Sequence, residues 1–320
     1  MKVSVVIPAF DAQATVGAAI SSALWQTSGD LEVVVVDDGS RDATAEIAGS
    51  FPEPVRMVSQ ENAGVAVARN RGIAEARGEL IAFCDADDVF LPGHLEALVE
   101  TFDRHGGGIA TSNCYWLFPN GIHPSRMRYK GRFPEPARQR LAILEQNFVS
   151  TMSLFPKALV EEIGPFDSEL AVAEDWDFWL RAIYAGHRVA LQPRPLALYR
   201  WGSESLSAAP ARMDEHAEAV LRRVAERDDL TADEREYLER RLSGPGPAVL
   251  GRNGDEALRA KRYRDAAASY TRAAGLCPSE PRLRWKARAM RLAPWLTGPL
   301  VRARQLRIEQ TVGFGEEHVR

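Results

Sequence analysis

The stretch ELIAFCDADD, residues 79–88, joins an apolar run of strand length to three carboxylates, Asp85, Asp87 and Asp88. An apolar run that ends on acids is typical of a buried strand whose carboxyl end opens into a loop. Like charges this close together disfavour each other's ionisation. The cluster is therefore either a solvated turn, with Asp88 capping the helix that follows, or a place where a cation binds.

Strands and helices alternate around this stretch. Apolar runs of strand length lie at residues 3–10, 31–38 and 55–60, and segments with helical spacing lie at 14–26, 42–50, 63–78 and 92–104. The alternation predicts an α/β fold with a mostly parallel central sheet that helices cover on both faces. Ligands of such sheets bind beyond the carboxyl ends of the strands. The acids of VVVVDDGS (33–40) and FCDADD (83–88) are both expected at that edge, which is the first indication of a site.

The pattern becomes less regular between residues 109 and 155, where a mobile loop and a helix are expected at 125–147. A helix at 173–186 and two short strands up to about residue 201 follow.

From about residue 208 the composition changes to Ala, Arg and Glu, which predicts two domains, 1–207 and a helical region at 208–320. Within residues 248–278, the spacing of seven residues resembles that of a tetratricopeptide repeat, in which two antiparallel helices pack together. The alternative is chance spacing in an Ala-rich pair of helices. These positions are Leu250, Gly254, Ala257, Ala266, Tyr270, Ala273 and Pro278.

Composition excludes several classes of protein. A net charge of -4 over 320 residues gives no general reason to expect a nucleic-acid partner. Three widely spaced cysteines without a CxxC pair fit a reducing cytoplasm. The six histidines show no zinc spacing. The sequence contains no apolar run of about 18 residues, so it predicts no helix that spans a membrane. The N-terminal apolar run ends on Asp11 without a small-residue cleavage site, which favours a first strand over a signal segment.

Acids alone cannot bind a phosphate, because both are anions. A divalent cation between them reverses the sign, and Mg²⁺ commonly joins one or two carboxylates to substrate phosphates. The sequence has neither a GxxxxGK[ST] loop nor a GxGxxG fingerprint. If the chain binds phosphates, a metal is therefore favoured over a glycine-rich cradle.

Several motifs, in this order and spacing, resemble the inverting family 2 glycosyltransferases, which have a GT-A fold. The resemblance covers about residues 1–205. The motifs are VSVVIPAFDAQATV (3–16), VVVVDDGSRDAT (33–44), NAGVAVARNRGIAEARGELIAFCDADD (62–88), IGPFD (163–167) and EDWDFWLRA (174–182). The resemblance implies an enzyme of bacterial polysaccharide biosynthesis that moves a sugar from a nucleotide-diphosphate donor, most often UDP-linked, to a hydroxyl of a glycan or glycolipid.

The same resemblance assigns the donor site. Asp38 is expected to hydrogen-bond the base, and its alternative role is to cap the DDGS turn. Arg69 is expected to offset phosphate charge, and its alternative is a solvent-facing position on a helix. Asp87, with Asp85, is expected to bind Mn²⁺ or Mg²⁺. The donor-binding residues implied are Pro8, Ala9, Phe10, Asp11, Asp38, Gly64, Arg69, Asp85 and Ala86.

Asp175 is implied to be the general base that takes the acceptor proton. Glu174 and Trp176 are weaker candidates for acceptor contacts. Acids in a first helical turn also favour the helix dipole, which explains Glu174 equally well, and Trp176 fits a core position better. Family members often carry a histidine shortly after residue 200 that can ligate the metal, but no histidine lies between His187 and His216. The remaining metal ligands are therefore unassigned.

The C-terminal segment 282–307 carries eight Arg or Lys residues and no acids. Trp285, Leu292, Trp295 and Leu296 lie between them. Peripheral contact with the inner face of the cell membrane is one hypothesis. A capping helix with a solvated basic face, or a contact within a homo-oligomer, is slightly favoured over it.

Two rival functions remain open. The chain could be a peptide or protein glycosyltransferase that holds its acceptor on the helical region. It could also be a non-catalytic helical-repeat interaction protein with a degenerate sugar-nucleotide domain. The presence together of Asp38, Asp85, Asp87 and Asp175 argues against the second.

Overall fold

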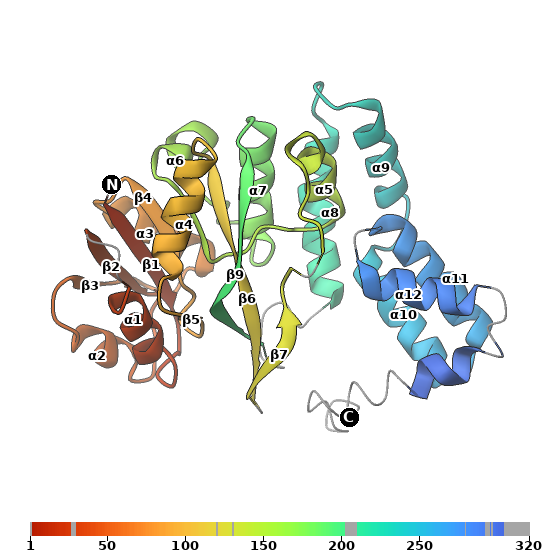
Figure 1. The fold of residues 1–320 in the computed structure, drawn as a ribbon, viewed down its shortest axis with the longest axis horizontal. Coiled ribbons are helices and arrows are strands. Elements are labelled where there is room, and N and C mark those ends of the chain that lie inside the picture. Colours follow the sequence, from red (N-terminus) through yellow and green to blue (C-terminus); the bar gives the residue numbers. More distant parts are fainter. Residues whose placement is uncertain are drawn as a thin grey trace. The chain divides into compact units, whose positions relative to one another are not determined.

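The apolar runs of the N-terminal part form the strands of a sheet (Figure 1). The structure is a computed structural model that describes residues 2–26, 30–119, 121–129, 131–201, 210–278, 280–291, 295 and 297–303. Within these residues, nine strands form one sheet in the order β3-β2-β1-β4-β8-β6-β9-β5, and β7 pairs with β6. The strands are β1 (Val3–Ala9), β2 (Leu31–Asp37), β3 (Val55–Ser59), β4 (Leu80–Phe83), β5 (Val89–Phe90), β6 (Ile109–Phe118), β7 (Gly121–Met127), β8 (Ser153–Pro156) and β9 (Val189–Arg200).

The strands that carry the predicted site are parallel. Strand β1 pairs in parallel with β2 and with β4, and β2 pairs in parallel with β3. Strand β8 is antiparallel to both β4 and β6, and β6 is parallel to β9. The predicted α/β class with a central parallel sheet is confirmed. Because two antiparallel steps restore the direction, β6 and β9 end at the same edge of the sheet as β1, β2 and β4.

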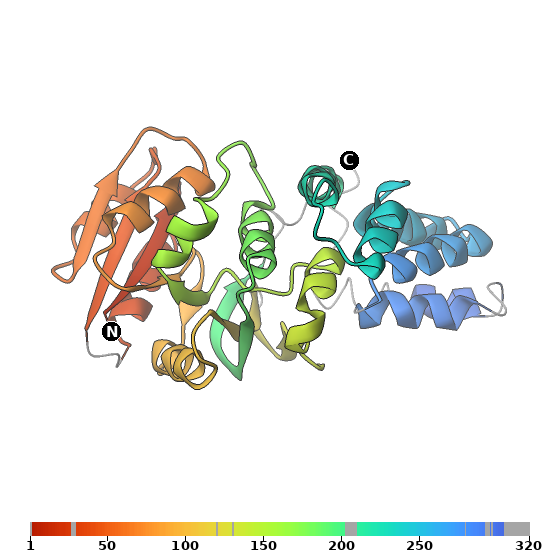
Figure 2. The same ribbon diagram turned by 90° about the horizontal axis from the view of Figure 1, so that it is seen from above.

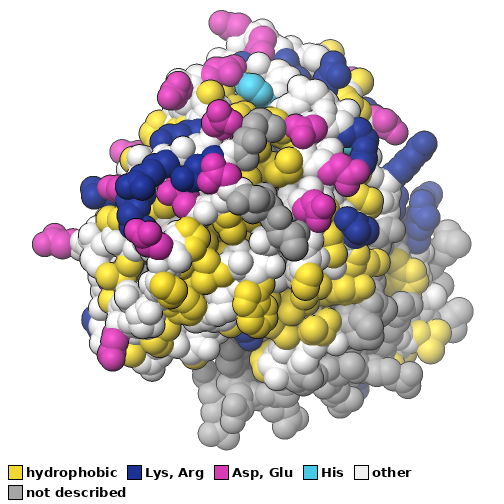
Figure 3. Space-filling model, turned by 60° about the vertical axis from the view of Figure 1, so that its left-hand side comes forward, with side chains coloured by type: hydrophobic (Ala, Val, Ile, Leu, Met, Phe, Trp, Pro, Cys, Tyr) yellow, Lys and Arg dark blue, Asp and Glu magenta, His cyan; other side chains and the backbone are white. Residues whose placement is uncertain are grey.

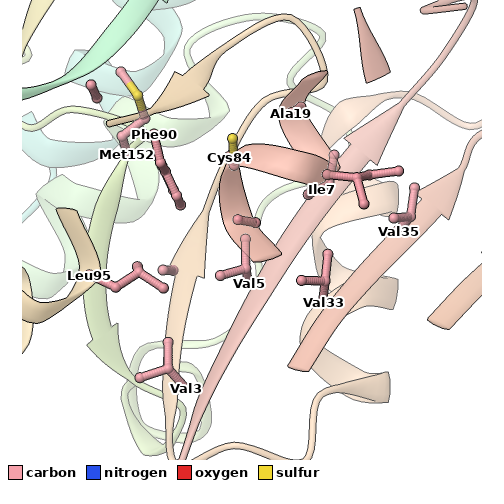
Figure 4. Packing of buried hydrophobic residues seen from close by; sticks show 14 of the residues in the cluster. Val3, Val5, Ile7, Ala19, Val33, Val35, Cys84, Phe90, Leu95 and Met152 are labelled. Atoms are coloured by element: carbon pink, nitrogen blue, oxygen red, sulfur yellow. The ribbon is translucent and has the colours of Figure 1, made fainter. Parts of the chain in front are cut away.

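Helices cover both faces of this sheet (Figure 2). Buried side chains of α1, α2 and α4 pack on one face, together with alternate residues of β1 and β2. Figure 4 shows Val3, Val5 and Ile7 of β1 in one apolar layer with Ala19 of α1 and Leu95 of α4. The helices of this part are α1 (Val16–Leu24), α2 (Thr44–Gly49), α3 (Val65–Glu75), α4 (His94–Arg104), α5 (Gln139–Glu145), α6 (Ala158–Ile163) and α7 (Glu174–Tyr184).

Two strands differ from the sequence-based expectation. The less regular stretch after residue 109 begins with β6, a strand of 10 residues. This strand contains the polar residues Thr111, Ser112 and Asn113, so its sequence is not an apolar run. The structure buries all three and satisfies them with hydrogen bonds. The two short strands expected before residue 201 are a single strand, β9, whose register with β6 shifts near Pro195.

The chain divides into two compact units. One holds residues 1–140 and 147–201, and the other holds residues 141–146 and 202–320. The described helices of the second unit are α8 (Pro210–Ala225), α9 (Ala232–Leu242), α10 (Pro247–Arg259), α11 (Tyr263–Leu276) and α12 (Pro281–Met290). The predicted helical character of the C-terminal region is confirmed.

Helices α10 and α11 pack closely at Gly254. A Cβ atom added to Gly254 would lie 2.6 Å from the ring of Tyr270, so the glycine lets the ring approach the helix backbone. Tyr270 also donates a 2.5 Å hydrogen bond to Asp255 Oδ1, and Lys286 of α12 contacts the same oxygen. The predicted tetratricopeptide character of this pair stays a prediction.

The basic C-terminal segment is only partly described. Lys286 is buried, whereas Trp295 is 64% exposed. Leu292, Leu296 and residues 304–307 lie outside the described residues. In the part of the chain that can be described, no helix combines the length and the apolar character needed to cross a membrane.

Candidate active site

The carboxyl ends of β1, β2 and β4 lie side by side, because β1 pairs with both of the other strands. Ala9 at the end of β1 is the partner of Asp37 at the end of β2. Strand β4 ends at Phe83, immediately before the acids of residues 85–88. The structure therefore brings the two groups of acids to one edge of the sheet, as the alternation predicted.

Phe10 follows β1 at this edge and is 43% exposed. In the view of Figure 3, hydrophobic side chains gather across the middle of the face, and charged side chains lie mainly above them. The guanidinium carbon of Arg41 lies 5.6 Å from the centre of the Phe10 ring. Asp11 accepts hydrogen bonds from the backbone N–H of Arg41 at 2.8 Å and from its Nη2 at 2.9 Å. An exposed ring is thus held beside a cation, which suits stacking on a flat ligand. The predicted donor residues with buried side chains here are Pro8, Ala9 and Ala86.

Asp38 is 3% exposed and accepts three hydrogen bonds. Oδ1 accepts from Gln60 Nε2 at 2.7 Å and from the Ala63 N–H at 2.9 Å, and Oδ2 accepts from the Gly64 N–H at 2.8 Å. The carboxylate therefore fixes the loop before α3. Gly64 has a φ of 92°, a backbone angle that residues other than glycine rarely adopt. A Cβ atom added to Gly64 would meet no atom within 4 Å. The loop leaves open space at this point of the edge.

Arg69 of α3 is the charged centre of the site. It is 3% exposed, so the solvent-facing alternative does not hold. Its Nη2 lies 2.9 Å from Asp85 Oδ1 and its Nη1 lies 2.5 Å from Glu174 Oε1. Burial favours loss of its proton, but the carboxylates around it outweigh burial and raise the pKa of Arg69. The guanidinium thus joins the turn after β4 to the start of α7.

The acids after β4 have different surroundings. Burial, helped by the charge of Asp85, raises the pKa of Asp87 to about 6. Burial likewise raises the pKa of Asp88 well above its usual value. Asp88 Oδ1 accepts the backbone N–H of Arg200 at 2.8 Å, and its Oδ2 has no hydrogen-bond partner among the described residues. Arg200 Nε also donates to the Asp87 carbonyl at 2.9 Å, so β9 holds this turn.

The donor set suits a divalent cation with further ligands from a substrate. In the described ranges, no three or more His, Cys, Asp or Glu side chains gather so as to hold a metal ion by themselves. Asp85 and Asp87 offer hard oxygen ligands, and the like charge that raises the pKa of Asp87 would be relieved by a cation. One or two carboxylates plus phosphate oxygens are a usual ligand set for Mg²⁺.

The first turn of α7 carries the implied base. Asp175 is partly buried, and its Oδ2 accepts a hydrogen bond from Asn147 Nδ2 at 3.0 Å. Burial and the neighbouring Glu174 raise the pKa of Asp175 to about 6, although Arg69 works against them. Glu174 is buried against Arg69, and Trp176 is buried. Arg69 thus contacts Asp85 and Glu174, and Asp175 follows Glu174 directly in the chain.

Sequence reasoning missed three residues near this site: Asn147, Arg128 and Arg200. Arg128 favours the ionised form of Asp175, and Arg200 holds the turn of Asp87 and Asp88. None of the three belongs to a local motif of acids, so only their contacts reveal them. The stretch expected to carry the absent histidine, residues 202–209, lies outside the described residues.

Comparisons with known proteins agree with this architecture. The model of the family described as glycosyl transferase family 2 matches residues 4–164. The succinoglycan biosynthesis protein ExoO of Rhizobium meliloti is 34% identical over 230 residues, which are 68% of this chain and 66% of that protein. An uncharacterized glycosyltransferase of Bacillus subtilis, EpsJ, is 30% identical over 229 residues, 67% of this chain and 66% of its own. The chain thus spans about two thirds of the length of these relatives.

Solved structures share the fold at low identity. S. aureus TarS 1-349 superposes with a TM-score of 0.62 at 20% identity, covering 92% of this chain and 89% of the other. That protein has also been solved in complex with UDP-GlcNAc. The mannosyltransferase PcManGT from Pyrobaculum calidifontis, in complex with GDP-Man and Mn²⁺, has a TM-score of 0.59 at 18% identity and covers 94% of this chain and 87% of its own.

Proposed function

The chain belongs to glycosyltransferase family 2, and from this premise we propose that it transfers a sugar from a UDP-linked donor to a hydroxyl of a glycan or glycolipid with inversion. The observation that carries the proposal is the pair of contacts that Arg69 makes. Arg69 binds Asp85, at the carboxyl end of β4, and Glu174, which precedes the proposed general base Asp175. The relation to a succinoglycan biosynthesis protein supports a glycan acceptor.

The donor lies across the carboxyl ends of β1, β2 and β4 in this proposal. Phe10 and Asp11 contact the base and ribose, and Asp38 accepts from the base with the lone-pair capacity that its three protein donors leave. Gly64 lets the donor approach the backbone, because the loop there is open. Asp85 contacts the ribose or the metal. The complex of TarS with UDP-GlcNAc supports the choice of a UDP-linked donor.

Asp85 and Asp87 would hold Mn²⁺ or Mg²⁺, which would supply charge stabilisation for the departing diphosphate. Arg200, which lies against the turn of Asp87, adds positive charge at the same place. The GDP-Man and Mn²⁺ complex of PcManGT supports this assignment of metal.

Asp175 acts as the general base. Its carboxylate takes the proton of the acceptor hydroxyl while the acceptor oxygen forms a bond to the anomeric carbon. The bond between that carbon and the diphosphate oxygen breaks on the opposite face, and its electron pair leaves with the nucleoside diphosphate. Burial raises the pKa of Asp175 toward neutrality, which suits a base that must both take and release a proton.

The helical unit is proposed to serve the acceptor. A membrane-bound or lipid-linked acceptor fits exposed Trp295 amid the basic segment, with the protein on the inner face of the membrane. The alternatives are a capping helix with a solvated basic face, a homo-oligomer contact, a peptide acceptor held on the helices and a non-catalytic scaffold. Flotation on anionic vesicles separates the first from the others, since only the membrane hypothesis requires retention.

The function is tested with the purified chain of 320 residues, UDP-GlcNAc and Mn²⁺, by measuring UDP release with water as the acceptor. The D175N variant should lose on the order of 10²–10⁴-fold in rate. The D87A variant should also lose rate, because it removes a ligand of the proposed cation. Asp233→Asn, a change in the other unit, is the control and should match the wild type. Wild-type rates in both D175N and D87A would refute the mechanism, and calorimetry with UDP and Mn²⁺ that detects no binding would favour the scaffold.

A further inference from the structure

The two oxygens of the Asp175 carboxylate have different partners. Oδ1 accepts the backbone N–H of Trp176 at 2.7 Å, within the first turn of α7. Oδ2 accepts a hydrogen bond from Asn147 Nδ2 at 3.0 Å. Asn147 lies outside every motif that carries the family resemblance. One neutral amide therefore holds the oxygen that the helix does not.

The orientation of the Asn147 amide follows from its second contact. Asn147 Oδ1 accepts the backbone N–H of Val149 at 3.2 Å. The oxygen is thereby assigned to Val149 and the NH₂ group to Asp175, because only this arrangement gives each atom a complementary partner. Asn147 can therefore act only as a donor toward Asp175, and it cannot take the acceptor proton itself.

The segment that carries Asn147 is clamped from the residues just after β7. Arg128 Nη2 donates to the carbonyls of Asn147 at 3.4 Å and of Val149 at 3.1 Å. The hydroxyl of Tyr129 donates to the carbonyl of Phe148. Three consecutive carbonyls are thus held by two neighbouring side chains. This leaves the Asn147 backbone little freedom to move away from α7.

Several charged groups also face Asp175. Glu174 on α7 favours its protonated form, whereas Arg69 on α3 and Arg128 after β7 favour its ionised form. The amide of Asn147 adds a hydrogen bond that favours the ionised form without adding charge. It therefore fixes geometry and supports ionisation at once.

We propose that Asn147 is a positioning residue for the base, and that Arg128 and Tyr129 hold it in place. The hydrogen bond to Oδ2 orients the carboxylate so that its remaining lone pairs face the acceptor hydroxyl. During transfer the proton moves from the acceptor oxygen to Asp175, and no bond to Asn147 forms or breaks. The inference rests on the proposed role of Asp175 and extends it to a residue outside the family motifs.

The first test needs no substrate. The carboxyl ¹³C signal of Asp175 is followed by NMR across pH in the full chain labelled at aspartate, and it is assigned by its absence in D175N. N147D places a second carboxylate at Oδ2 and should raise the titration midpoint by about one pH unit or more. N147A should raise it by less. Asn253→Asp, the same chemical change on an exposed part of α10, should leave it unchanged.

The second test separates positioning from simple damage. UDP release from UDP-GlcNAc with Mn²⁺ should show an acidic limb that lies at higher pH in N147D than in the wild type. If that limb moves by one pH unit, kcat on it should fall by up to about tenfold. The KM for the donor should stay within about twofold, because Asn147 contacts the proposed general base Asp175 and none of the donor-binding residues. N147A should share this pattern in weaker form, and thermal melting of each variant reports whether it is folded.

The outcomes distinguish the inference from the function it rests on. Wild-type activity in D175N would overturn the base, whatever Asn147 does. Loss of activity in D175N, together with unchanged NMR midpoints and pH profiles in folded N147D and N147A, would overturn the positioning role alone. If the wild type releases no UDP, the choice of donor fails, and the NMR midpoints still decide the role of Asn147.

Discussion

Arg69 shows how much of the site depends on contacts between distant residues. It lies on α3 and binds acids that are 16 and 105 positions away, Asp85 and Glu174. The family motifs placed Arg69 near the donor, but helical spacing reports only which face is apolar. Its burial between two carboxylates could not be predicted, because an ion pair across such separations leaves no local pattern.

Replacing Arg69 should therefore damage stability as well as activity. R69M leaves Asp85 and Glu174 without their shared cation, and Glu174 is buried, so we expect a loss of about 3 kcal/mol in the free energy of unfolding. Urea unfolding followed by circular dichroism measures it. Arg71→Met removes an exposed i,i+4 pair with Glu75 on the same helix and should cost less than about 1 kcal/mol. Equal losses in the two variants would contradict the central role of Arg69.

The raised pKa of Asp87 predicts a pH-dependent response to metal. Since its pKa is about 6 in the fold, against an ordinary value of 3.8, the carboxyl is protonated at pH 5 and ionised at pH 7.5. The fold thus opposes ionisation as pH rises through about 6, and a bound cation would offset this. Mn²⁺ with UDP should raise the melting temperature clearly at pH 7.5 and much less at pH 5.

Asp87→Asn is the control for this experiment. The amide keeps the size of the side chain but removes the titration, so the effect of Mn²⁺ should become small at both pH values. A response in the wild type that is equal at pH 5 and pH 7.5 would contradict the assignment of Asp87 as a metal ligand.

At the scale of elements, the sequence predicted the strands that are mostly apolar and missed one that is not. Strands β1, β2 and β4 are mostly apolar, with Ser4 and Glu32 as buried exceptions that bond to each other, so their positions and the acids at their ends were predictable. Strand β6 buries Thr111, Ser112 and Asn113. Thr111 and Asn113 bond to β8, β9 and a loop, and the Ser112 hydroxyl donates to the Asn113 carbonyl on β6 itself. Such a strand cannot be recognised from hydrophobicity, because its burial depends on contacts the sequence does not display.

The packing of α10 on α11 allows a matched pair of glycine replacements. G254A would push a methyl group to within 2.6 Å of the Tyr270 ring, so we expect the helical unit to lose about 1–3 kcal/mol of stability. Gly275 lies on α11 with no atom within 4 Å of an added Cβ, and G275A should stabilise by up to about 1 kcal/mol. The melting temperatures of the two variants should move in opposite directions, and a melting temperature of G254A that does not fall would show that the Gly254 contact is not tight.

At the scale of the whole molecule, the chain enters the second unit twice. Residues 141–146 belong to it, residues 147–201 return to the first unit, and the chain then re-enters the second. Within the second unit, Gln146 Oε1 lies 3.6 Å from Cys277 Sγ. Composition predicted the later change near residue 208, but residues 141–146, most of which belong to α5, carry no compositional signal.

A chain shortened to end at Trp201 should therefore be unstable. It would keep residues 141–146, including the apolar Ile143 and Leu144, but lose the rest of the unit to which they belong. Exposed apolar surface of this kind promotes association, so light scattering should detect aggregates. A chain ending at residue 303 keeps every described contact and should remain monodisperse. A monodisperse chain ending at Trp201, with an unchanged melting temperature, would contradict this expectation.

The double entry also bears on how such enzymes can diverge. A single crossover near residue 201 would combine one protein's residues 141–146 with another protein's helical bundle, and the two surfaces would not match. Exchange of the helical region between relatives needs two coordinated replacements, one of them only six residues long and ending directly before Asn147. We therefore expect the helical region to be inherited together with residues 141–146 and to change in step with them.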